Sequence, residues 1–443
     1  METSSSPSKS LPFFFFFFLI FPFIAEASVP PSKTFKFVNQ GDLGEFSVEY
    51  LADYRPLSIV QFPFTLCFYN TTPNAFTLAL RMGDRHTESI MRWVWEANRG
   101  NPVGENATLT FGRDGNLILA HADGRVAWQT GTANRGVTGL KLLPNGNLVL
   151  HDKRGGFVWQ SFDHPTDTLL VGQSLLLGGP TKLVSRVSAK DGSEGPYSYG
   201  MEGRRLVMYY KSKNSGKPLL YYQSDEFGDG RGALAHLNFT SAPESDTAFA
   251  FELKYGFDMI NSPSFGTFIL SRPKYNTTYS FLRVGFDGNL RIYTFYDKVD
   301  WGPWEVTYTL FGRDEGDESE CRIPTRCGSM GVCEDDQCVA CPRPQGFLGW
   351  SAKDCAPPTL LPCKGGANVD YYKVVGVEHF MNAYTEGDGP MSVAQCRDKC
   401  NKDCGCLGFF YREESSKCLL APELGTMTKV SNTHHVAFIK ISK

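Results

Sequence analysis

Three segments of the chain carry polar side chains at alternate positions: 112–120, 143–151 and 285–293. Each contains Asp-Gly-Asn or Asn-Gly-Asn. Alternate residues of an extended segment point to the same side, where carboxylate and amide groups can bind the hydroxyl groups of a ligand. The same dipeptides are also typical of tight turns, so a purely structural role is the alternative.

No other group of residues predicts a reaction. The eight His are scattered, and we find no serine nucleophile elbow, phosphate-binding loop or paired-carboxylate motif in the sequence. The 44 Lys and Arg against 47 Asp and Glu give a formal net charge of −3. This charge gives no overall attraction to nucleic acid. We therefore expect a binding protein without a cofactor, and not an enzyme.

Residues 1–27 are predicted to be a secretory signal peptide. Lys9 precedes the apolar run LPFFFFFFLIFPFIAEA, which ends in Ala-Glu-Ala, a small-x-small cleavage sequence. The alternative is a membrane anchor, for which the run is short. We expect a secreted mature chain without a membrane span. Four Asn-x-Ser/Thr sequons agree with secretion, and each predicts an exposed, glycosylated turn: Asn70, Asn106, Asn238 and Asn276.

The cysteines gather towards the C-terminus. Of 13 Cys, 12 lie between Cys321 and Cys418, a density typical of a disulfide-stabilised region. Cys338-x-x-Cys341 also fits a zinc-binding knuckle, but disulfides are favoured in a secreted chain, and we expect no metal. The odd number leaves Cys67, within the apolar FTLCFYN, as a buried free thiol or, alternatively, as half of an intermolecular disulfide.

The region before these cysteines contains an internal repeat. TLTFGRDGNLILAHADGRVAWQT aligns with GLKLLPNGNLVLHDKRGGFVWQS at an offset of 31 residues, and in both copies an Asn precedes a Trp by 12 residues, as Asn289 precedes Trp301. Each unit is predicted to form strand, turn, strand, turn, strand. Because so short a unit cannot bury its own apolar face, three should pack around a common axis. Trp95, Trp128 and Trp159 should then point inward as core residues.

These repeats resemble the bulb-type, curculin-like mannose-binding lectins of plants, whose domain is a β-prism of three pseudo-symmetric subdomains. The resemblance is carried by VWEANRGNPV, FGRDGNLIL, PNGNLVL and VWQSFDHPTDTLLVGQSL, the last of which is also similar to S-locus glycoproteins. PFTLCFYNTTPNAFTLALRMG looks like the epidermis-specific secreted glycoproteins of this family. The resemblance implies a mostly β fold, with a bulb-type lectin domain over 28–164 and a second, divergent lectin-like domain over 165–312.

The resemblance also identifies the alternating polar residues as sugar-binding positions. The family's mannose site is written Gln-x-Asp-x-Asn-x-Val-x-Tyr, and every copy here departs from it. The five positions hold Gly112, Asp114, Asn116, Ile118 and Ala120; Leu143, Asn145, Asn147, Val149 and His151; and Gly285, Asp287, Asn289, Arg291 and Tyr293. The best remaining candidates are Asp287, Asn289 and Tyr293. The degenerate candidates are Asp114, Asn116, Asn145, Asn147, Val149 and His151.

The C-terminal part resembles an EGF-like module over 313–357 and a PAN/apple domain over 358–443. MSVAQCRDKCNKDCGC predicts a helix that begins with a capping box of Ser392 and Gln395. Three cysteines recur every four residues on one face of this helix, and Gly405 is expected to end it.

Spacing alone leaves 15 pairings open for six cysteines. The resemblance implies Cys321–Cys333, Cys327–Cys338 and Cys341–Cys355 in the first module. In the second it implies Cys396–Cys418 and Cys400–Cys406, which leaves Cys363 to pair with Cys404.

The resemblance implies a secreted cell-wall or apoplastic glycoprotein that binds mannose-type glycans weakly, or glycoproteins that carry them. The alternative is an extracellular scaffold without sugar binding, which acts through protein partners or self-association of the PAN/apple domain. In related receptor kinases a membrane span and a kinase follow this ectodomain. This sequence ends at Lys443, so we expect no signalling by the chain itself.

Overall fold

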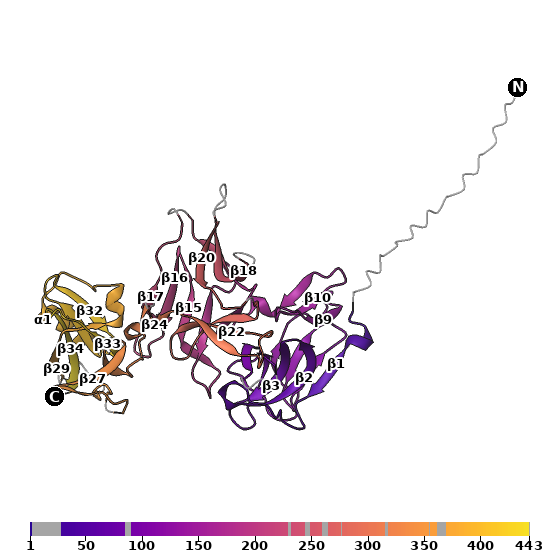
Figure 1. Cartoon of the computed structure of the whole chain (residues 1–443), viewed down its shortest axis with the longest axis horizontal. Coiled ribbons are helices and arrows are strands. Elements are labelled where there is room, and N and C mark those ends of the chain that lie inside the picture. Colours follow the sequence, from indigo (N-terminus) through magenta and orange to yellow (C-terminus); the bar gives the residue numbers. More distant parts are fainter. Residues whose placement is uncertain are drawn as a thin grey trace.

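The computed structural model describes residues 1, 28–84, 90–228, 232–243, 249–258, 265–275, 277–314, 318–353, 355–360 and 369–442. The predicted signal peptide therefore lies almost wholly outside the described residues. The chain is mostly β, as predicted, and forms three bodies in a row (Figure 1). We call them the first unit (β1–β11), the second unit (β12–β23) and the C-terminal region (β24–β34 with α1).

Three antiparallel sheets form the first unit. Their strands, in order within each sheet, are β2 (Asp53–Gln61), β3 (Phe64–Asn70), β4 (Phe76–Met82) and β5 (Arg92–Glu96); β1 (Phe35–Val38), β6 (Thr108–Phe111), β7 (Leu117–Ala120) and β8 (Val126–Gln129); and β11 (Phe157–Gln160), β10 (Leu148–His151) and β9 (Gly139–Leu142). Trp95, Trp128 and Trp159 meet edge to face, with ring centroids 6.0, 6.0 and 5.8 Å apart. The three rings meet as predicted, but only Trp95 is buried, at 5% exposed, whereas Trp128 and Trp159 are partly exposed and line a cleft.

The third copy of the repeat is longer than its sequence spacing suggested. In the first two copies the Trp pairs with the residue three positions after the Asn, as Leu119 pairs with Trp128. The corresponding residue after Asn289 is Ile292, and it pairs with Tyr308. Trp301 is instead 72% exposed, in a turn with φ 74°. The spacing of 12 residues to Trp301 therefore misplaced the position, because a longer turn joins the two strands.

The second unit repeats the arrangement of three sheets with longer strands. The sheets are β12 (Thr168–Leu170), β21 (Ser280–Val284), β22 (Leu290–Phe295) and β23 (Trp304–Thr309); β13 (Ser174–Leu176), β18 (Leu234–Pro243), β19 (Phe249–Phe257) and β20 (Phe265–Ser271); and β14 (Lys182–Arg186), β15 (Glu194–Glu202), β16 (Arg205–Tyr210) and β17 (Leu219–Gln223). β12 pairs with β21, so the start and the end of the unit lie side by side. This contact brings the third motif segment next to the first unit.

A five-stranded sheet unites the two modules that the sequence suggested for the C-terminal region. It runs β28 (Gly346–Gly349), β27 (Gln337–Arg343), β26 (Met330–Glu334), β33 (Gly425–Lys429) and β30 (Val377–His379). β26 and β33 pair in parallel, so residues from 313–357 and 358–443 share one sheet. A second sheet runs β29 (Val369–Val375), β34 (His435–Ser442), β31 (Gly408–Arg412) and β32 (Lys417–Ala421), and β24 (Phe311–Gly312) pairs with β25 (Glu318–Ser319).

Helical elements are few and short. α1 (Val393–Lys402) begins with the predicted capping box, in which Ser392 Oγ accepts from Gln395 N. The helix ends at Lys402, so Cys404 lies beyond it and not on its face as predicted. The reason is that Asp403 Oδ1 accepts from Gly405 N at 2.8 Å and forms a turn there. The 3₁₀ helices are η1 (Pro31–Lys33), η2 (Glu49–Leu51), η3 (Ser161–Asp163), η4 (Glu320–Arg322) and η5 (Phe380–Ala383).

Disulfides close the C-terminal region. The structure contains Cys321–Cys333, Cys327–Cys338, Cys341–Cys355, Cys396–Cys418 and Cys400–Cys406, the pairs that the family resemblance implied. Cys404 is disulfide-bonded, but Cys363 lies outside the described residues, so that pairing stays a prediction. Cys67 is a buried free thiol, and burial raises its pKa to about 12.

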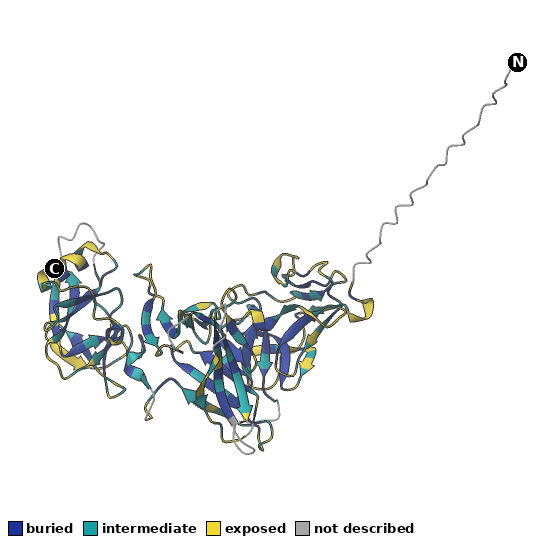
Figure 2. Cartoon of the chain, turned by 90° about the horizontal axis from the view of Figure 1, so that it is seen from above, coloured by how far each residue is buried: buried dark blue, intermediate teal, exposed yellow. Residues whose placement is uncertain are grey.

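The buried residues follow the strands, and exposed residues gather in the loops (Figure 2). One continuous core runs from the second unit into the C-terminal region and includes Tyr199, Ile323 and Met427. Hydrogen bonds cross the same junction, from Tyr197 to Thr325 at 2.5 Å and from Ser212 to Glu423 at 2.7 Å. In the described part of the chain, no helix is long and apolar enough to cross a membrane.

Candidate functional site

The first motif segment is bonded within the protein. Asp114 Oδ1 accepts from Asn116 N at 3.1 Å and shapes the turn between β6 and β7. The Asn116 side chain, only 4% exposed, donates to Gln129 Oε1 at 2.9 Å and accepts from Thr130 Oγ1 at 3.0 Å and Thr132 N at 3.1 Å. The amide therefore joins the turn to the end of β8. The Asn116 amide therefore has little hydrogen-bonding capacity left for a ligand.

The second motif segment repeats this arrangement. Asn145 Oδ1 accepts from Asn147 N at 3.2 Å. Asn147 is 3% exposed, and its side chain donates to Gln160 Oε1 at 2.8 Å and accepts from Phe162 N at 3.3 Å. Both Asn residues therefore have structural roles in a turn, which is the alternative that the sequence left open.

The remaining positions of the second segment do not complete a sugar site. Val149 is 0% exposed, so it cannot pack against a sugar ring. His151 Nδ1 donates to the carbonyl of Asp152 at 2.9 Å. The His151 ring lies beside a shallow hollow of about 400 Å³ whose lining includes Ile59 and Leu140. The candidate residues of this segment are thus divided between the core and a different surface.

The third motif segment differs in its surroundings. Gly285, Asp287, Arg291 and Tyr293, four of its five motif positions, line one cavity of about 210 Å³. The fifth, Asn289, is 1% exposed, and its side chain donates to the carbonyl of Phe311 at 2.6 Å. Asn289 is therefore structural, but the other polar side chains of this segment face a common space.

Asp287 and Arg291 form an ion pair within that segment. Arg291 Nη1 lies 2.7 Å from Asp287 Oδ2, while Asp287 Oδ1 accepts from Asn289 N at 3.2 Å. A Cβ atom at Gly285 would collide with Asp287 Oδ1, so the glycine at the family's Gln position permits this Asp conformation. A sugar hydroxyl would therefore compete with Arg291 for the carboxylate.

The opposite wall of the cavity belongs to a buried charge network that links the two units. Glu49 of the first unit accepts from Arg283 of the second at 2.9 Å and from Arg92 at 2.8 Å. Tyr50 has a left-handed backbone with φ 68°, and its ring lies 4.1 Å from the guanidinium of Arg186. Burial raises the pKa of Tyr50, which keeps its hydroxyl neutral.

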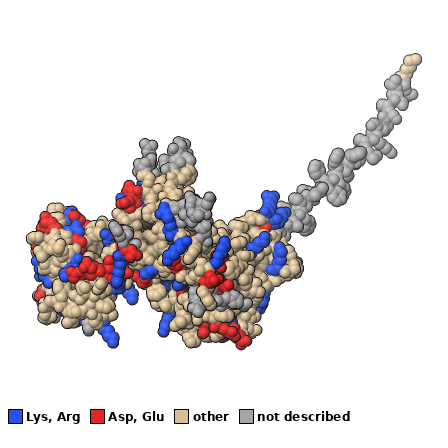
Figure 3. Space-filling view, viewed as in Figure 1, with Lys and Arg blue, Asp and Glu red and all other residues tan. Residues whose placement is uncertain are grey.

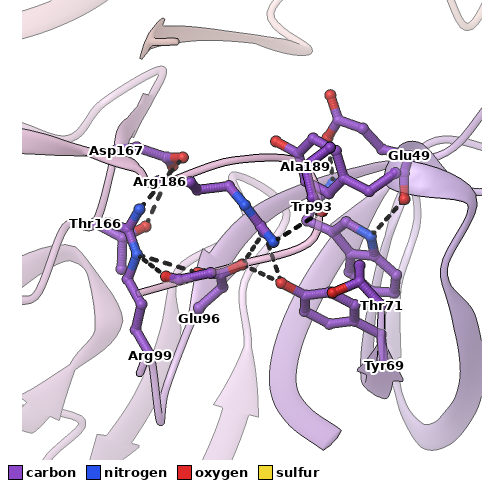
Figure 4. Close-up of polar contacts among 12 residues, drawn as sticks. Glu49, Tyr69, Thr71, Trp93, Glu96, Arg99, Thr166, Asp167, Arg186 and Ala189 are labelled. Atoms are coloured by element: carbon purple, nitrogen blue, oxygen red, sulfur yellow. Dashed lines mark hydrogen bonds and ion pairs between the residues drawn. The ribbon is translucent and has the colours of Figure 1, made fainter. Parts of the chain in front are cut away.

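A second cluster of the network surrounds Glu96 (Figure 4). Arg186 Nη1 of the second unit donates to Glu96 Oε1 and to the Tyr69 hydroxyl, both at 2.7 Å. Tyr69 in turn donates to Glu96, and Arg99 Nε lies 3.4 Å from the other oxygen of Glu96. Sequence analysis missed these residues. Their signal is a charged residue at each end of a short, mainly apolar strand, as in RWVWE and KLVSR.

The glycosylation sequons lie in varied surroundings. Asn106 is exposed in a turn, with φ 61°. Asn70 is 7% exposed at the end of β3, and Asn238 lies half-buried within β18. The expected exposed turn is therefore wrong for Asn70 and Asn238, because both end up in strands of packed sheets. Asn276 lies outside the described residues.

The three-sheet units and their repeated turn motifs define a class of protein, the bulb-type lectins. The family model described as D-mannose binding lectin matches residues 92–190. Among solved structures, the monomeric monocot mannose-binding lectins from Gastrodia elata match at 21% identity, covering 29% of this chain and 96% of that chain with a TM-score of 0.17.

Full-length relatives narrow the assignment. EP1-like glycoprotein 2 of Arabidopsis thaliana is 49% identical over 442 residues, which covers 94% of this chain and 95% of that protein. Epidermis-specific secreted glycoprotein EP1 of Daucus carota is 54% identical over 363 residues, covering 79% of this chain and 92% of that protein. The chain belongs to this family of EP1-like glycoproteins.

Proposed function

We propose that this protein is a secreted plant cell-wall glycoprotein that binds mannose-type glycans weakly, at the cavity lined by segment 285–293. One observation carries the proposal: four of the five motif positions of this segment line a single cavity. In the other two segments Asn116, Asn147 and Val149 are buried. Secretion is supported by the name of the carrot relative and by the disulfides of the C-terminal region.

The polar groups of the cavity suit a sugar. The Asp287 carboxylate accepts hydrogen bonds and the Tyr293 hydroxyl can both donate and accept them, whereas the Arg291 guanidinium competes with the sugar for the carboxylate. The volume of about 210 Å³ is below the roughly 300–1,000 Å³ of sites for larger ligands, so the cavity fits a single sugar unit. The Asp287–Arg291 ion pair must open for a hydroxyl to bind, which keeps the affinity low. A Kd near the millimolar range, about −4 kcal/mol, is expected.

Calorimetry with methyl α-mannoside tests this proposal. Asp287→Ala should abolish binding, because it removes the acceptor. Arg291→Val should strengthen binding several-fold, because it frees the carboxylate and restores the apolar residue of the family motif. Asp114→Ala is the matched control, since Asp114 and Asp287 both accept from the backbone of the Asn two residues on. The proposal fails if neither the native protein nor Arg291→Val binds any mannoside, or if Asp114→Ala weakens binding as much as Asp287→Ala.

A second candidate function, an extracellular scaffold, has a specific observation in its favour. β28 is the terminal strand of the five-stranded sheet. Phe347 and Leu348 on this strand are 52% and 51% exposed, and the adjacent Trp350 is 39% exposed. An exposed apolar edge strand offers unpaired backbone groups for another strand. Self-association through β28 would make the C-terminal region the interaction module.

A further inference from the structure

A groove begins at the junction between the first and second units and continues over the second unit, away from the motif cavity. Its first part is a cleft of about 870 Å³, where Trp128 and Trp159 face Lys182 and Glu194. Its second part is a hollow of about 640 Å³ along β15 and β16. Lys182, Val184 and Glu194 line both parts, so the two hollows adjoin, and we treat them together as one elongated groove.

Aromatic rings form one wall of this groove. The exposed His164 ring stacks on Trp159, with centroids 5.4 Å apart and planes 17° apart. Trp128 meets Trp159 edge to face at 5.8 Å and is itself only partly buried. Flat aromatic surfaces beside polar groups suit the C–H-bearing face of a sugar ring, which is apolar while the ring's edge carries hydroxyls.

Polar side chains of both signs line the rest of the groove. The exposed cations are Arg135, Lys182, Lys211 and Lys217. The exposed anions are Asp163, Glu194 and Glu202. A near balance of charge disfavours a polyanion, whereas hydroxyl groups can both donate and accept. Acidic and basic side chains also occur together on all three bodies in Figure 3, which shows no single-sign face.

The walls of the groove are held in place across the junction. Arg99 of the first unit donates to the carbonyls of Val184 and Gly192 in the second unit, both at 2.7 Å. Trp95 Nε1 donates to the carbonyl of His164 at 3.0 Å. A site with fixed walls loses less conformational entropy when it binds a ligand.

We propose that this groove binds a neutral oligosaccharide chain of several sugar units. Each of its two parts alone has the volume of a typical ligand site, so together they hold a chain longer than the 210 Å³ motif cavity can. The site uses none of the mannose-motif residues, and it goes beyond the proposed function. Failure of mannoside binding at Asp287 would not contradict the proposal of a binding groove.

The test measures affinity against chain length. Calorimetry on the intact secreted protein uses neutral oligomannosides, oligoglucosides and oligoxylosides of one to six units, with an oligogalacturonide as the charged probe. We expect the affinity for at least one neutral series to rise tenfold or more from one unit to six. His164→Ala and Lys182→Ala should each lower the affinity for that hexasaccharide about tenfold, or ~1.4 kcal/mol.

The controls separate this groove from other sites. Lys213→Ala removes an exposed lysine outside the groove lining and should change nothing, and Asp287→Ala should leave hexasaccharide binding unchanged. His164→Ala keeps the backbone carbonyl that Trp95 uses, so its fold is checked by an unchanged Tm. Equal affinity for one and six units, no loss in either groove variant, or preference for the oligogalacturonide would overturn the proposal.

Discussion

Asparagine side chains act as bridges at equivalent positions of the fold. Asn116 and Asn147 each join a turn to the last residue of a following strand, and Asn289 joins a turn to Phe311, where β24 begins. The first two bond a Gln side chain, whereas Asn289 bonds the backbone of Phe311. An amide offers both a donor and an acceptor, and loss of such a buried group costs about 1–3 kcal/mol. The Asn position of each motif segment therefore stabilises the fold and does not bind a ligand.

His379 should make the stability depend on pH. It is 2% exposed, and its Nε2 donates to the carbonyl of Glu423 at 2.9 Å while its Nδ1 accepts from Met381 N at 3.3 Å. Burial lowers the pKa of His379 to about 3. The unfolded chain, with a pKa near 6.5, therefore binds a proton that the folded chain excludes. The free energy of unfolding should be constant above pH 6.5 and should fall as the pH drops from 6.5 towards 3.

The expected loss is about 2 kcal/mol between pH 6.5 and 4.5. Urea denaturation at a series of pH values measures it. His379→Asn should remove most of this slope, whereas substitution of the exposed His434 by Asn should keep it. A slope that persists unchanged in His379→Asn would assign the pH dependence to other groups.

Local hydrogen bonds and disulfide bonds stabilise the elements of the C-terminal region. α1 begins where Ser392 and Gln395 cap each other, and it ends where Asp403 turns the chain. Cys396 and Cys400 on its buried face are joined to Cys418 and Cys406, so the helix is fastened to β32 and to the loop before β31. β28, by contrast, has a neighbouring strand on one side only among the residues that the structure describes.

The open edge of β28 predicts concentration-dependent self-association. Sedimentation of the native protein should show a dimer at high concentration, formed by pairing of two β28 edges. Leu348→Lys should leave a monomer, because two added charges would meet in that interface. Leu177→Lys is a matched control, since Leu177 is also 51% exposed but lies in the second unit. A native protein that stays monomeric throughout, or a Leu177→Lys variant with the same defect, would exclude this interface.

The whole molecule depends on buried charges that join its units. Arg186 and Arg283 come from the second unit, and their carboxylate partners Glu96 and Glu49 come from the first. Side-chain exposures of 2% and 6% for Arg186 and Glu96 show that this pair is shielded from water. Such a pair fixes the relative orientation of the two units, because separating them would leave each buried charge without its partner at 2.7 Å.

Arg186→Met should destabilise the protein by about 3–5 kcal/mol, because it removes the cation 2.7 Å from the buried Glu96 carboxylate and leaves only the more distant Arg99, at 3.4 Å. Chemical denaturation of the intact protein measures this change. Arg205→Met is the matched control: Arg205 pairs with Glu226 at 3.1 Å at the surface, and its loss should cost less than about 1 kcal/mol. Addition of Glu96→Gln to Arg186→Met should restore part of the stability. Equal effects of the two Arg substitutions would contradict a joining role for Arg186.

Much of the fold could be predicted because short-range patterns specify it. Turn dipeptides, alternating strands, the repeated Trp and the capping box of α1 each depend on residues close in sequence. The site was harder to predict. Glu49 and Arg283, which form one wall of the motif cavity, are 234 residues apart, and no local pattern pairs them.

The sequence by itself determined the mostly β fold, the repeat with its three converging Trp and the disulfide-rich C-terminal region, since these follow from composition and local periodicity. Only the tertiary structure decided that the side chains of Asn116 and Asn147 are hydrogen-bonded within the protein, and that Asp287 and Tyr293 line a cavity. Only the tertiary structure brings together the residues that line the groove. The physical reason is that burial and hydrogen-bond satisfaction depend on which strands and units come to lie together.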